Sequence, residues 1–431
     1  MKMMARKRYA LIGTGGRAEM FYAALATDYR ETSELVAFCD LNQTRMDYAN
    51  EQLTSKYDYR AIPTYKAEEF ERMIEREKPD TIIVTTIDRT HHTYIIRAMQ
   101  AGCDVISEKP MTVDEEKCQE IIDTVKSTGK QLRVTFNYRY APHNTKIREL
   151  IMDGTIGDVF SVHFEWLLNT EHGADYFRRW HRDKRNSGGL LVHKSTHHFD
   201  LVNFWLGTEP DTVFALGGLN FYGRENAEKR GVTEFYQRAH GSEIAKEDPF
   251  ALHMEDKPSL KGLYLDAEKE DGYQRDQSVF GDGINIEDTM GVLVKFKNKA
   301  IMTYSLNAYM PWEGYRVVFN GSKGRIEVNV VEKSYVNAGG EKSLEGALEG
   351  KQLTVFPMFD EPYSAEVEEG IGGHGGGDRV MLNDIFGIPD EDRFKRAASH
   401  IDGAKSILTG VAGNISLRTG LPVRVKDLVQ F

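Results

Sequence analysis

Short apolar runs alternate with longer stretches of helical periodicity over the first third of the chain. The apolar runs predict strands at residues 9–13, 35–40, 81–86, 104–107 and 132–136. The periodic stretches predict helices at residues 18–27, 43–53, 67–77, 92–101 and 114–127. Strands and helices that alternate in this order form a parallel sheet with helices on its faces. We therefore predict a doubly wound α/β domain over residues 1–137.

The pattern changes after about residue 137. Residues 158–168, 212–219, 291–296, 300–306, 315–320 and 325–329 look like strands of a larger, mainly antiparallel open sheet. Several of them alternate apolar and polar residues, as expected for a sheet that is covered on one face only. We predict a C-terminal α+β domain over residues 138–431 that binds substrate. Its open face is free for a ligand or for another subunit of a homo-oligomer, a dimer or tetramer.

Two further segments of this second half differ from their surroundings. Residues 404–420 regain a helical rhythm rich in small residues. Residues 220–285 are charged, contain Gly and Tyr, and follow no clear period. So long an insertion is more often functional or interfacial than idle.

Length and composition fit a globular protein of two domains. The 431 residues exceed one typical core, since cores stop growing at roughly 250–300 residues. No apolar run approaches the ~20 residues of a membrane helix, and the basic residues 1–8 lead into a strand without a cleavable leader, so we expect a cytoplasmic protein without a membrane partner. The net charge of -11 argues against nucleic acid as a partner, because that affinity comes largely from Lys and Arg.

The three cysteines predict neither a disulfide framework nor a structural zinc site. Cys39, Cys103 and Cys118 are scattered without CxxC spacing. An odd number of isolated cysteines in a chain of this length is typical of reduced core residues.

A glycine-rich turn follows the first predicted strand and opens the first predicted helix. The run Gly13-Thr14-Gly15-Gly16-Arg17-Ala18 fits GxGxxA. Glycines there let the backbone turn tightly and approach a pyrophosphate, and the helix N-terminus adds N–H groups and a positive dipole end. We predict a Rossmann-type site with cofactor contacts at Gly13, Gly15, Gly16, Arg17 and Ala18. An ordinary strand-to-helix turn is the alternative.

The end of the second predicted strand bears on the choice of cofactor. Asp40 stands where a carboxylate accepts hydrogen bonds from the ribose hydroxyls and repels a 2′-phosphate, which favours NAD over NADP. A role as a turn residue is the alternative for Asp40. Arg45, a few residues on, leaves use of both cofactors open, although a solvated helix face is the other interpretation.

Two segments carry candidate chemistry. Glu108 and Lys109 directly follow the strand at residues 104–107, so Lys109 projects toward the ligand crevice at the carboxyl ends of the strands; a solvated surface lysine is the alternative. In the second segment His193, His197 and Asp200 lie on one face if the chain is helical there. This spacing also suits a zinc site, or a core pair of Asp200 with one histidine; we expect no metal.

The order of these motifs resembles the glucose-fructose oxidoreductase, inositol dehydrogenase and MocA (Gfo/Idh/MocA) family. The matching segments are GTGGRA, CD after the second strand, TTIDRTHH, AGCDVISEKP, FNYRYAP, GGLLVHKSTHHFD and NGSKGRIE. The resemblance covers residues 8–428 and implies a Rossmann domain, an α+β domain, and oxidation or reduction of sugars and cyclitols with a nicotinamide cofactor.

The resemblance also implies roles for single residues. The lysine of EKP, here Lys109, sits at the reacting hydroxyl, and the last residue of the DxGxH pattern, here His197, is the general base. His193 replaces the usual aspartate of that pattern and Ser195 its glycine. These departures affect the orientation of substrate and the proton relay, and we keep His193 as a catalytic candidate.

Further candidates come from the same comparison. As cofactor contacts we expect Thr86, Asp88, His92, Glu108 and Lys109, with a histidine of the pair at 91–92 near substrate. As substrate contacts we expect Tyr138, Arg139, Lys194, His198 and His374, the last from a glycine-rich run at residues 372–378 that closes over the site or serves as a linker.

The chemistry agrees with these residue types. Removing hydride from a carbinol carbon requires a base for the hydroxyl proton, and histidine serves near neutral pH. Three functions remain open: an NAD-dependent sugar or cyclitol dehydrogenase, a glycoside-cleaving enzyme that retains NAD and oxidises a ring hydroxyl transiently, and a non-catalytic NAD-binding regulator. Retention of Lys109 and His197 argues against the regulator.

Overall fold

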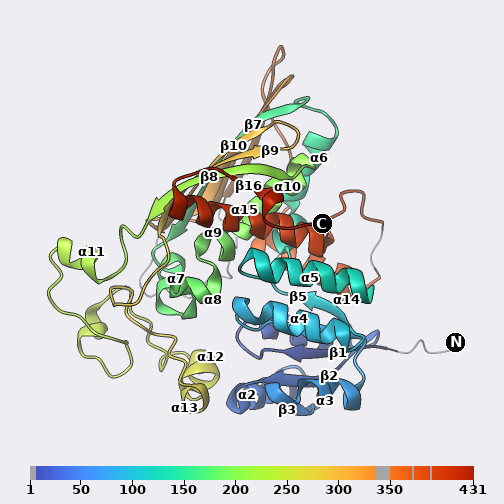
Figure 1. The fold of residues 1–431 in the computed structure, drawn as a ribbon, viewed down its shortest axis with the longest axis vertical. Coiled ribbons are helices and arrows are strands. Elements are labelled where there is room, and N and C mark those ends of the chain that lie inside the picture. Colours follow the sequence, from blue (N-terminus) through green and yellow to red (C-terminus); the bar gives the residue numbers. More distant parts are fainter. Residues whose placement is uncertain (1–5, 335–349, 371–372, 389–390) are drawn as a thin grey trace.

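The computed structural model describes residues 6–334, 350–370, 373–388 and 391–431. Within these ranges the chain forms two sheets (Figure 1). The first has the strand order β15-β6-β5-β4-β1-β2-β3, and the second has the order β14-β13-β12-β11-β7-β10-β9-β8-β16. Of the basic residues 1–8, which were predicted to lead into the first strand, residues 1–5 lie outside the described part of the chain.

The first sheet is a Rossmann-type parallel sheet, as predicted. Its strands are β1 (Lys7–Ile12), β2 (Ser33–Asp40), β3 (Thr64–Lys66), β4 (Thr81–Val84), β5 (Asp104–Ser107) and β6 (Leu132–Val134). Its helices are α1 (Ala18–Ala26), α2 (Gln43–Ser55), α3 (Phe70–Glu77), α4 (His91–Gln100) and α5 (Glu115–Thr128). All five predicted strands and all five predicted helices are confirmed. The three-residue β3 was not predicted because it has no apolar run.

The second sheet is mostly antiparallel, and its only parallel pair among the described strands joins β7 and β10. Its strands are β7 (Val159–Asn169), β8 (Pro210–Gly218), β9 (Thr289–Phe296), β10 (Ile301–Met310), β11 (Glu313–Gly321), β12 (Gly324–Lys333), β13 (Gly350–Pro357), β14 (Tyr363–Ser364) and β16 (Val423–Arg424). The six predicted strands are confirmed. The antiparallel α+β architecture predicted for this half is therefore present.

Helices cover one face of this second sheet. They are α6 (Pro142–Met152), α7 (His172–Arg178), α9 (Leu190–His193), α10 (Ser195–Leu206) and α15 (His400–Thr419), the last of which packs on β8. The short helix α8 (Lys184–Ser187) precedes α9, and α14 (Gly377–Phe386) contacts α1 of the first domain. The opposite face is open: Phe160, Leu216, Leu293 and Ile301 are each at least 47% exposed, although their strand neighbours are buried. Alternation in β8, β9 and β10 therefore separates a core face from a free apolar face.

The last strand of the first sheet comes from near the C-terminus. β15 (Ala398–Ser399) pairs antiparallel with β6, so that Ala398 lies opposite Val134. Phe386 at the end of α14 packs edge-on against Tyr9 of β1, with 5.0 Å between ring centroids. The second half of the chain thus returns to complete the first sheet. A domain boundary at residue 137 stays a prediction.

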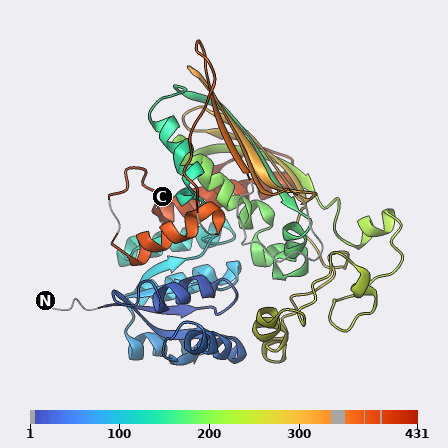
Figure 2. The same ribbon diagram turned by 180° about the vertical axis from the view of Figure 1, so that it is seen from behind.

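The insertion at residues 220–285 folds into short helices with a small core of their own. They are α11 (Arg224–Lys229), η5 (Ile244–Glu247), α12 (Pro258–Leu260), the π-helix η6 (Lys261–Leu265) and α13 (Glu268–Asp271). Leu252, Met254, Leu263 and Tyr264 form an apolar cluster against Tyr48 of α2. Figures 1 and 2 both show α12 and α13 beside α2, so the insertion reaches from the second sheet back to the first.

Two smaller expectations also concern the fold. Cys39, Cys103 and Cys118 are free and buried, as predicted. Among the described helices, none combines the length and the apolar character needed to cross a bilayer.

Candidate active site

A cleft of about 860 Å³ runs between the Rossmann sheet, the insertion and the second sheet. Its lining includes the predicted residues Gly13, Gly15, Gly16, Arg17, Asp40, Thr86, Asp88, Glu108, Lys109, His193, Lys194, His197 and His374. Most of the residues predicted from separate motifs therefore meet at one cavity. Its volume lies within the roughly 300–1,000 Å³ typical of small-molecule and cofactor sites.

The glycine turn lies at one end of the cleft. Gly13 has a φ of +93°, and a Cβ atom there would lie 2.7 Å from the Thr85 carbonyl carbon, so only glycine allows β1 to turn this close to β4. Gly15 and Gly16 both border the cavity. The predicted cofactor contact at Ala18 needs correction. Ala18 is the fully buried first residue of α1 and does not line the cleft, because the last small residue of the motif serves helix–strand packing.

Asp40 borders the same end and holds the turn in shape. Its Oδ2 accepts hydrogen bonds from Thr14 N at 2.5 Å and Thr14 Oγ1 at 2.9 Å, while Oδ1 accepts from Asn42 N. Carboxylate oxygens accept more than one bond each, so Asp40 can still bind ribose hydroxyls. The glycine turn, its strand and this carboxylate therefore fit the adenosine and pyrophosphate half of a dinucleotide.

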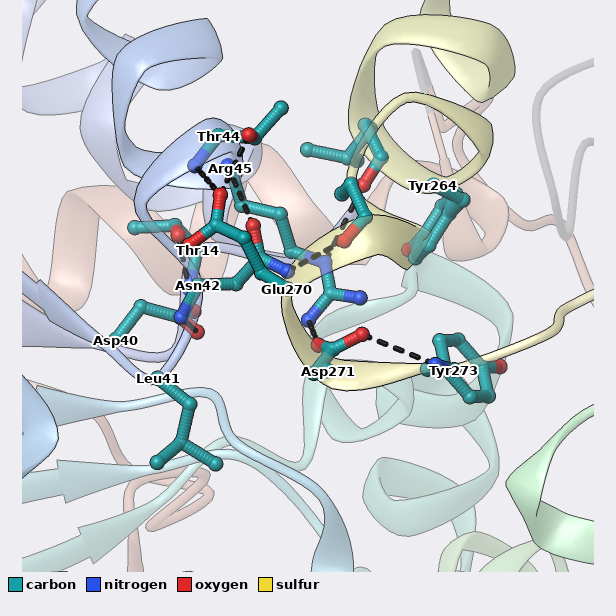
Figure 3. A network of polar contacts seen from close by, with 12 residues as sticks. Thr14, Asp40, Leu41, Asn42, Thr44, Arg45, Tyr264, Glu270, Asp271 and Tyr273 are labelled. Atoms are coloured by element: carbon teal, nitrogen blue, oxygen red, sulfur yellow. Dashed lines mark hydrogen bonds and ion pairs between the residues drawn. The ribbon is translucent and has the colours of Figure 1, made fainter.

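Arg45 is not on a solvated helix face. Its guanidinium forms an ion pair with Asp271 at 2.7 Å and donates to the Leu263 carbonyl, and its side chain is 12% exposed (Figure 3). Arg45, which in the sequence left NADP possible as a cofactor, is therefore already paired with Asp271 of the insertion. A 2′-phosphate at Arg45 would have to displace Asp271.

The other end of the cleft contains Lys109, which follows β5 as predicted. Glu108 beside it accepts a hydrogen bond from Arg17 Nε at 2.8 Å, which connects the glycine turn to the lysine loop. Both Glu108 and Arg17 line the cavity. The two motifs are thus joined by an ion pair along the cleft floor.

Asp88 and two histidines form a compact group next to Lys109. His193 Nδ1 lies 2.5 Å from Asp88 Oδ2, and the ring of His181 packs edge-on against His193 with 4.2 Å between centroids. Burial lowers the pKa of both imidazoles well below 6.5, helped by the positive charges of Arg179 and Lys109. Both histidines are therefore neutral near pH 7.

His197 is the candidate base. It is 3% exposed, and its Nδ1 has no hydrogen-bond partner among the described residues. Burial, followed by the charges of Lys109 and Lys194, lowers its pKa well below 6.5. His197 lines the cleft, and a neutral imidazole at the reacting centre is able to accept a proton.

The chain is not one continuous helix through these histidines, as the spacing argument supposed. α9 ends at His193 and α10 begins at Ser195. Asp200 faces Arg139 and not a histidine: the guanidinium donates to both carboxylate oxygens, at 2.7 and 2.6 Å. The predicted face of His193, His197 and Asp200 is therefore wrong, and so is a zinc site built from those three residues.

The prediction that Arg139 contacts substrate also needs correction. Its side chain is 3% exposed, paired with Asp200 and Asp402, and it borders a separate cavity behind α10. A buried guanidinium that is saturated by carboxylates has no donor to offer a substrate in the main cleft. The arginine points into the core because α10 brings Asp200 to it.

Three further predicted contacts do not line the cleft. Tyr138 is 2% exposed and packs edge-on against His197 and His374, at 4.8 and 5.1 Å between centroids, so it positions those rings. His198 stacks on Trp166 at 3.9 Å in the core. His92 bonds the Arg89 carbonyl on the surface side of α4, and its neighbour His91 borders the cleft instead.

The glycine-rich run ends in ordered structure at the cleft. Gly372 lies outside the described residues, but His374 is 7% exposed and its Nδ1 pairs with Asp378 Oδ2 at 2.9 Å at the start of α14. His374 lines the cavity as expected. Its contact with sugar stays a prediction.

Sequence reasoning missed the residues that positions 172–181 and the insertion contribute. His172, Tyr176, Arg179, His181, Tyr264 and Arg275 all line the cavity. The dense HGADYFRRWH run at residues 172–181 was a signal that could have been read as a site. Tyr264 and Arg275 had none, since the insertion has no period.

A divalent cation has one set of candidate ligands among the described residues. One ligand atom each of Asp88, His181 and His193 lies within 4.8 Å of the others, a donor set that zinc accepts. Lys109 and Arg179 act on the same groups with positive charge. The expectation of no metal thus stays a prediction.

Family models match both halves of the chain. Residues 7–136 match the NAD-binding Rossmann fold of the GFO_IDH_MocA oxidoreductase family, and residues 148–425 match the C-terminal alpha/beta domain of that family. The two matches follow the order of the two sheets.

Known proteins are similar to the whole chain or to part of it. The chain is 36% identical over 436 residues to the oxidoreductase-type protein YteT of Bacillus subtilis (strain 168), covering 99% of both chains. It is 28% identical over 200 residues to D-glucoside 3-dehydrogenase of Escherichia coli (strain K12), covering 46% of this chain and 54% of that protein. Aldose-aldose oxidoreductase from Caulobacter crescentus, solved with glycerol, shares the fold with a TM-score of 0.63 at 18% identity, covering 97% and 100% of the two chains.

Proposed function

Because the chain belongs to the Gfo/Idh/MocA oxidoreductase family, we propose that it transfers a hydride between NAD and a secondary hydroxyl of a sugar, glycoside or cyclitol. One observation carries the proposal: a single cleft is lined by the glycine turn at one end and by Lys109 and His197 at the other. A dinucleotide and a polyol would meet between them.

The side chains at the reacting end supply what alcohol oxidation needs from a protein. His197 is neutral and accepts the hydroxyl proton, while the Lys109 ammonium favours the deprotonated oxygen electrostatically. NAD supplies the hydride chemistry. Burial of His197 keeps it neutral at pH values where a free histidine would be protonated, so the base is ready when substrate binds.

NAD is the proposed cofactor in preference to NADP. Asp40 borders the cleft where ribose hydroxyls would lie, and Arg45 is engaged with Asp271. A carboxylate without a free arginine beside it favours a hydroxyl over a phosphate. Asp40→Ala should therefore reduce the preference for NAD; an unchanged ratio of NAD to NADP affinity would contradict this role.

A polyol substrate fits the polar lining of the reacting end. Lys194, His172 and His374 line the same cavity as His197. The partial likeness to D-glucoside 3-dehydrogenase supports sugar glycosides as the class to test first. Lys194 and His374 are the proposed hydroxyl contacts.

A second candidate function is glycoside cleavage with NAD retained between oxidation and return of the hydride. The contact of the insertion with α2 and the glycine turn favours it, since Tyr264 and Arg45 close the cleft beside the cofactor end. A non-catalytic regulator is the third, and the presence of both Lys109 and His197 in the cleft argues against it.

We also propose a homo-oligomer formed through the open face of the second sheet. Its exposed apolar side chains, among them Phe160, Leu216, Leu293 and Ile301, would be covered by another copy. Light scattering should give a mass above that of one chain for the wild type and a lower mass for Leu293→Glu. A monomeric wild type would contradict this part.

The deciding experiment incubates the protein with NAD and a panel of sugars and glycosides. NADH absorbance and release of the aglycone are followed together. NADH formed in proportion to oxidised product supports the dehydrogenase, whereas aglycone release without net NADH supports the cleaving enzyme. If neither signal appears for any compound while NAD binds, the regulator is favoured.

A further inference from the structure

The insertion touches the Rossmann domain at the donor that a pyrophosphate would use. The hydroxyl of Tyr264, in η6, accepts a hydrogen bond from Gly16 N at 2.9 Å. A Cβ atom on Gly16 would lie 3.1 Å from the same hydroxyl. An oxygen atom of the insertion thus already sits at the N-terminus of the nine-residue helix α1.

The segment is anchored on both sides of that contact. The Glu270 carboxylate accepts from the backbone N–H groups of Gln43 and Thr44 at 2.7 Å each, and its ion pair with Lys66 is 3.0 Å long. Asn42 Nδ2 donates to the Ala267 carbonyl at 2.9 Å. We call residues 258–275 the clasp. Its anchors are on the β2–α2 turn, which carries the adenosine side of the cleft.

Two arginines behind Tyr264 have unused donors. Arg275 is 7% exposed, and its Nε and Nη1 have no hydrogen-bond partner among the described residues; Nε of Arg179 has none either. Both line the cleft. A buried charged donor left unpaired is strongly destabilising, so these donors call for an acceptor in the cavity.

The local charge balance calls for an anion. A single carboxylate, Asp175, accepts from Arg178, Arg179 and Arg275, at 3.2, 3.0 and 3.2 Å. The Arg275 guanidinium also lies over the Tyr264 ring, 4.8 Å from its centroid. The positive charge is therefore next to the phenol that bonds Gly16.

The positive charge of these arginines also affects the ionisation of the Tyr264 phenol. Burial would raise the pKa of Tyr264, but the guanidinium groups of Arg275 and Arg179 and the Gly16 N–H outweigh it and lower the pKa. An oxygen that carries negative charge is thus stabilised at this point, as a phosphate oxygen would be.

We propose that the clasp and Arg179 form the second half of the dinucleotide site, in which the guanidinium groups of Arg275 and Arg179 bind the pyrophosphate from the side opposite Gly15 and Gly16. The proposal rests on the proposed NAD-dependent function and assigns the cofactor site residues outside the Rossmann domain. A pyrophosphate oxygen would take over the Gly16 N–H from Tyr264, while the anchors on α2 hold the clasp closed. The dinucleotide would then stay bound between catalytic cycles.

Titration calorimetry with three probes tests the anion half-site. NAD and ADP-ribose contain the pyrophosphate, and adenosine does not. In Arg275→Met, the affinity for NAD and ADP-ribose should fall at least about tenfold, while that for adenosine stays within about threefold. Arg275→Lys, which keeps the charge, should lose less. Arg224→Met, at an exposed arginine of the same insertion paired with Glu228, is the matched control and should change none of the three.

The outcomes separate this proposal from the function on which it rests. Equal affinity of wild type and Arg275→Met for NAD and ADP-ribose, with both proteins folded by circular dichroism, overturns the half-site. In that case a rise in KM for glucose 6-phosphate or glucuronate, but not for glucose, would assign the arginines to an anionic substrate. If the wild type binds adenosine, ADP-ribose and NAD no better than the buffer control, the NAD-dependent function fails.

A second variant tests the anchors without touching the arginines. Glu270→Gln removes the charge that pairs with Lys66 and accepts from the N-terminus of α2. Bound NADH is displaced with excess NAD, and its release is followed by the change in NADH fluorescence. The release should become at least about fivefold faster than in wild type. An unchanged release rate would overturn the clasp as the element that holds the cofactor.

Discussion

The Asp88 carboxylate and the His193 imidazole meet across the cleft, with 2.5 Å between Oδ2 and Nδ1. Asp88 follows β4 of the first sheet, whereas His193 ends α9 beneath the second. The family pattern has an aspartate where this chain has His193. A carboxylate is nevertheless present at this point, because the Rossmann domain supplies it from the opposite wall.

This pair should contribute to proton movement at the reacting end. Burial raises the pKa of Asp88 and lowers that of His193, so the difference in proton affinity between the two groups is smaller than in water and a proton can move between them. Asp88→Asn keeps the size but cannot take up that proton, and kcat should fall by roughly 10- to 100-fold while NAD binding is retained. Asp123→Asn, at an exposed position on α5, is the control; an unchanged kcat in Asp88→Asn would exclude the relay.

The same group should not retain a metal ion. Lys109 and Arg179 place positive charge next to Asp88 and His193, which disfavours a dication beside them. We expect less than one tenth of an equivalent of zinc, about background, by mass spectrometry of the purified protein, and activity that survives EDTA. A stoichiometric metal whose removal stops turnover would show that Asp88, His181 and His193 are ligands.

Lys109→Ala and His197→Ala should each abolish turnover and leave NAD affinity nearly intact. Loss of a general base alone costs about 10²–10⁴ in rate, and the glycine turn that holds the dinucleotide is elsewhere in the cleft. Steady-state kinetics and calorimetry on the same preparations check this. Either variant turning over at the wild-type rate would refute the assignment of its residue.

Arg139→Met should destabilise the protein without changing the KM for sugar. It leaves Asp200, 1% exposed, without its bidentate partner, and breaking a buried ion pair costs about 3–5 kcal/mol. Burial raises the pKa of Asp200 to about 6 even with Arg139 present. The double variant Arg139→Met/Asp200→Leu should recover much of the loss in thermal unfolding. A large rise in KM at unchanged melting temperature would restore Arg139 as a substrate contact.

Stability should fall in acid because of His143. This side chain is 2% exposed, and burial lowers its pKa to about 3. Since the unfolded chain binds the proton near pH 6.5, the folded state has its full stability above that pH and loses it as the pH falls toward 3. The loss from this residue between pH 7 and pH 5 is about 2 kcal/mol.

Urea unfolding of wild type and His143→Leu checks this estimate. The variant should lose about 2 kcal/mol less than the wild type between pH 7 and pH 5, and the two should respond alike between pH 7 and pH 8. Parallel losses in acid would mean that His143 is not the residue responsible.

Local patterns predicted the parts of the site that depend on neighbours in the sequence. The Gly13 turn and the Lys109 loop both follow strands of a parallel sheet, whose carboxyl ends meet at one edge, so their convergence could be inferred. The same rule failed for Arg139. The direction of the Arg139 side chain depends on its ion pair with Asp200, 61 residues later in the chain. No sequence pattern near Arg139 predicts that partner.

The histidines show a second limit. His197 and His198 are adjacent and of the same type, and only the packing of Trp166 and Tyr304 on His198 decides which of them reaches the cleft. The break between α9 and α10 changes the face on which His193 lies. The role of Tyr264 depends on a contact with Gly16 across 248 positions, in a segment with no period.

The two-residue strand β15 bears on the rate at which the cofactor can enter and leave. Because it ties residues 398–399 to β6, rotating one whole domain away from the other would tear an edge from the Rossmann sheet. That leaves the clasp as the moving part. Loops rearrange within nanoseconds to microseconds and hinged domains within roughly microseconds to milliseconds, so the entry and departure of NAD should follow the stability of the clasp anchors rather than a slow opening of the whole molecule.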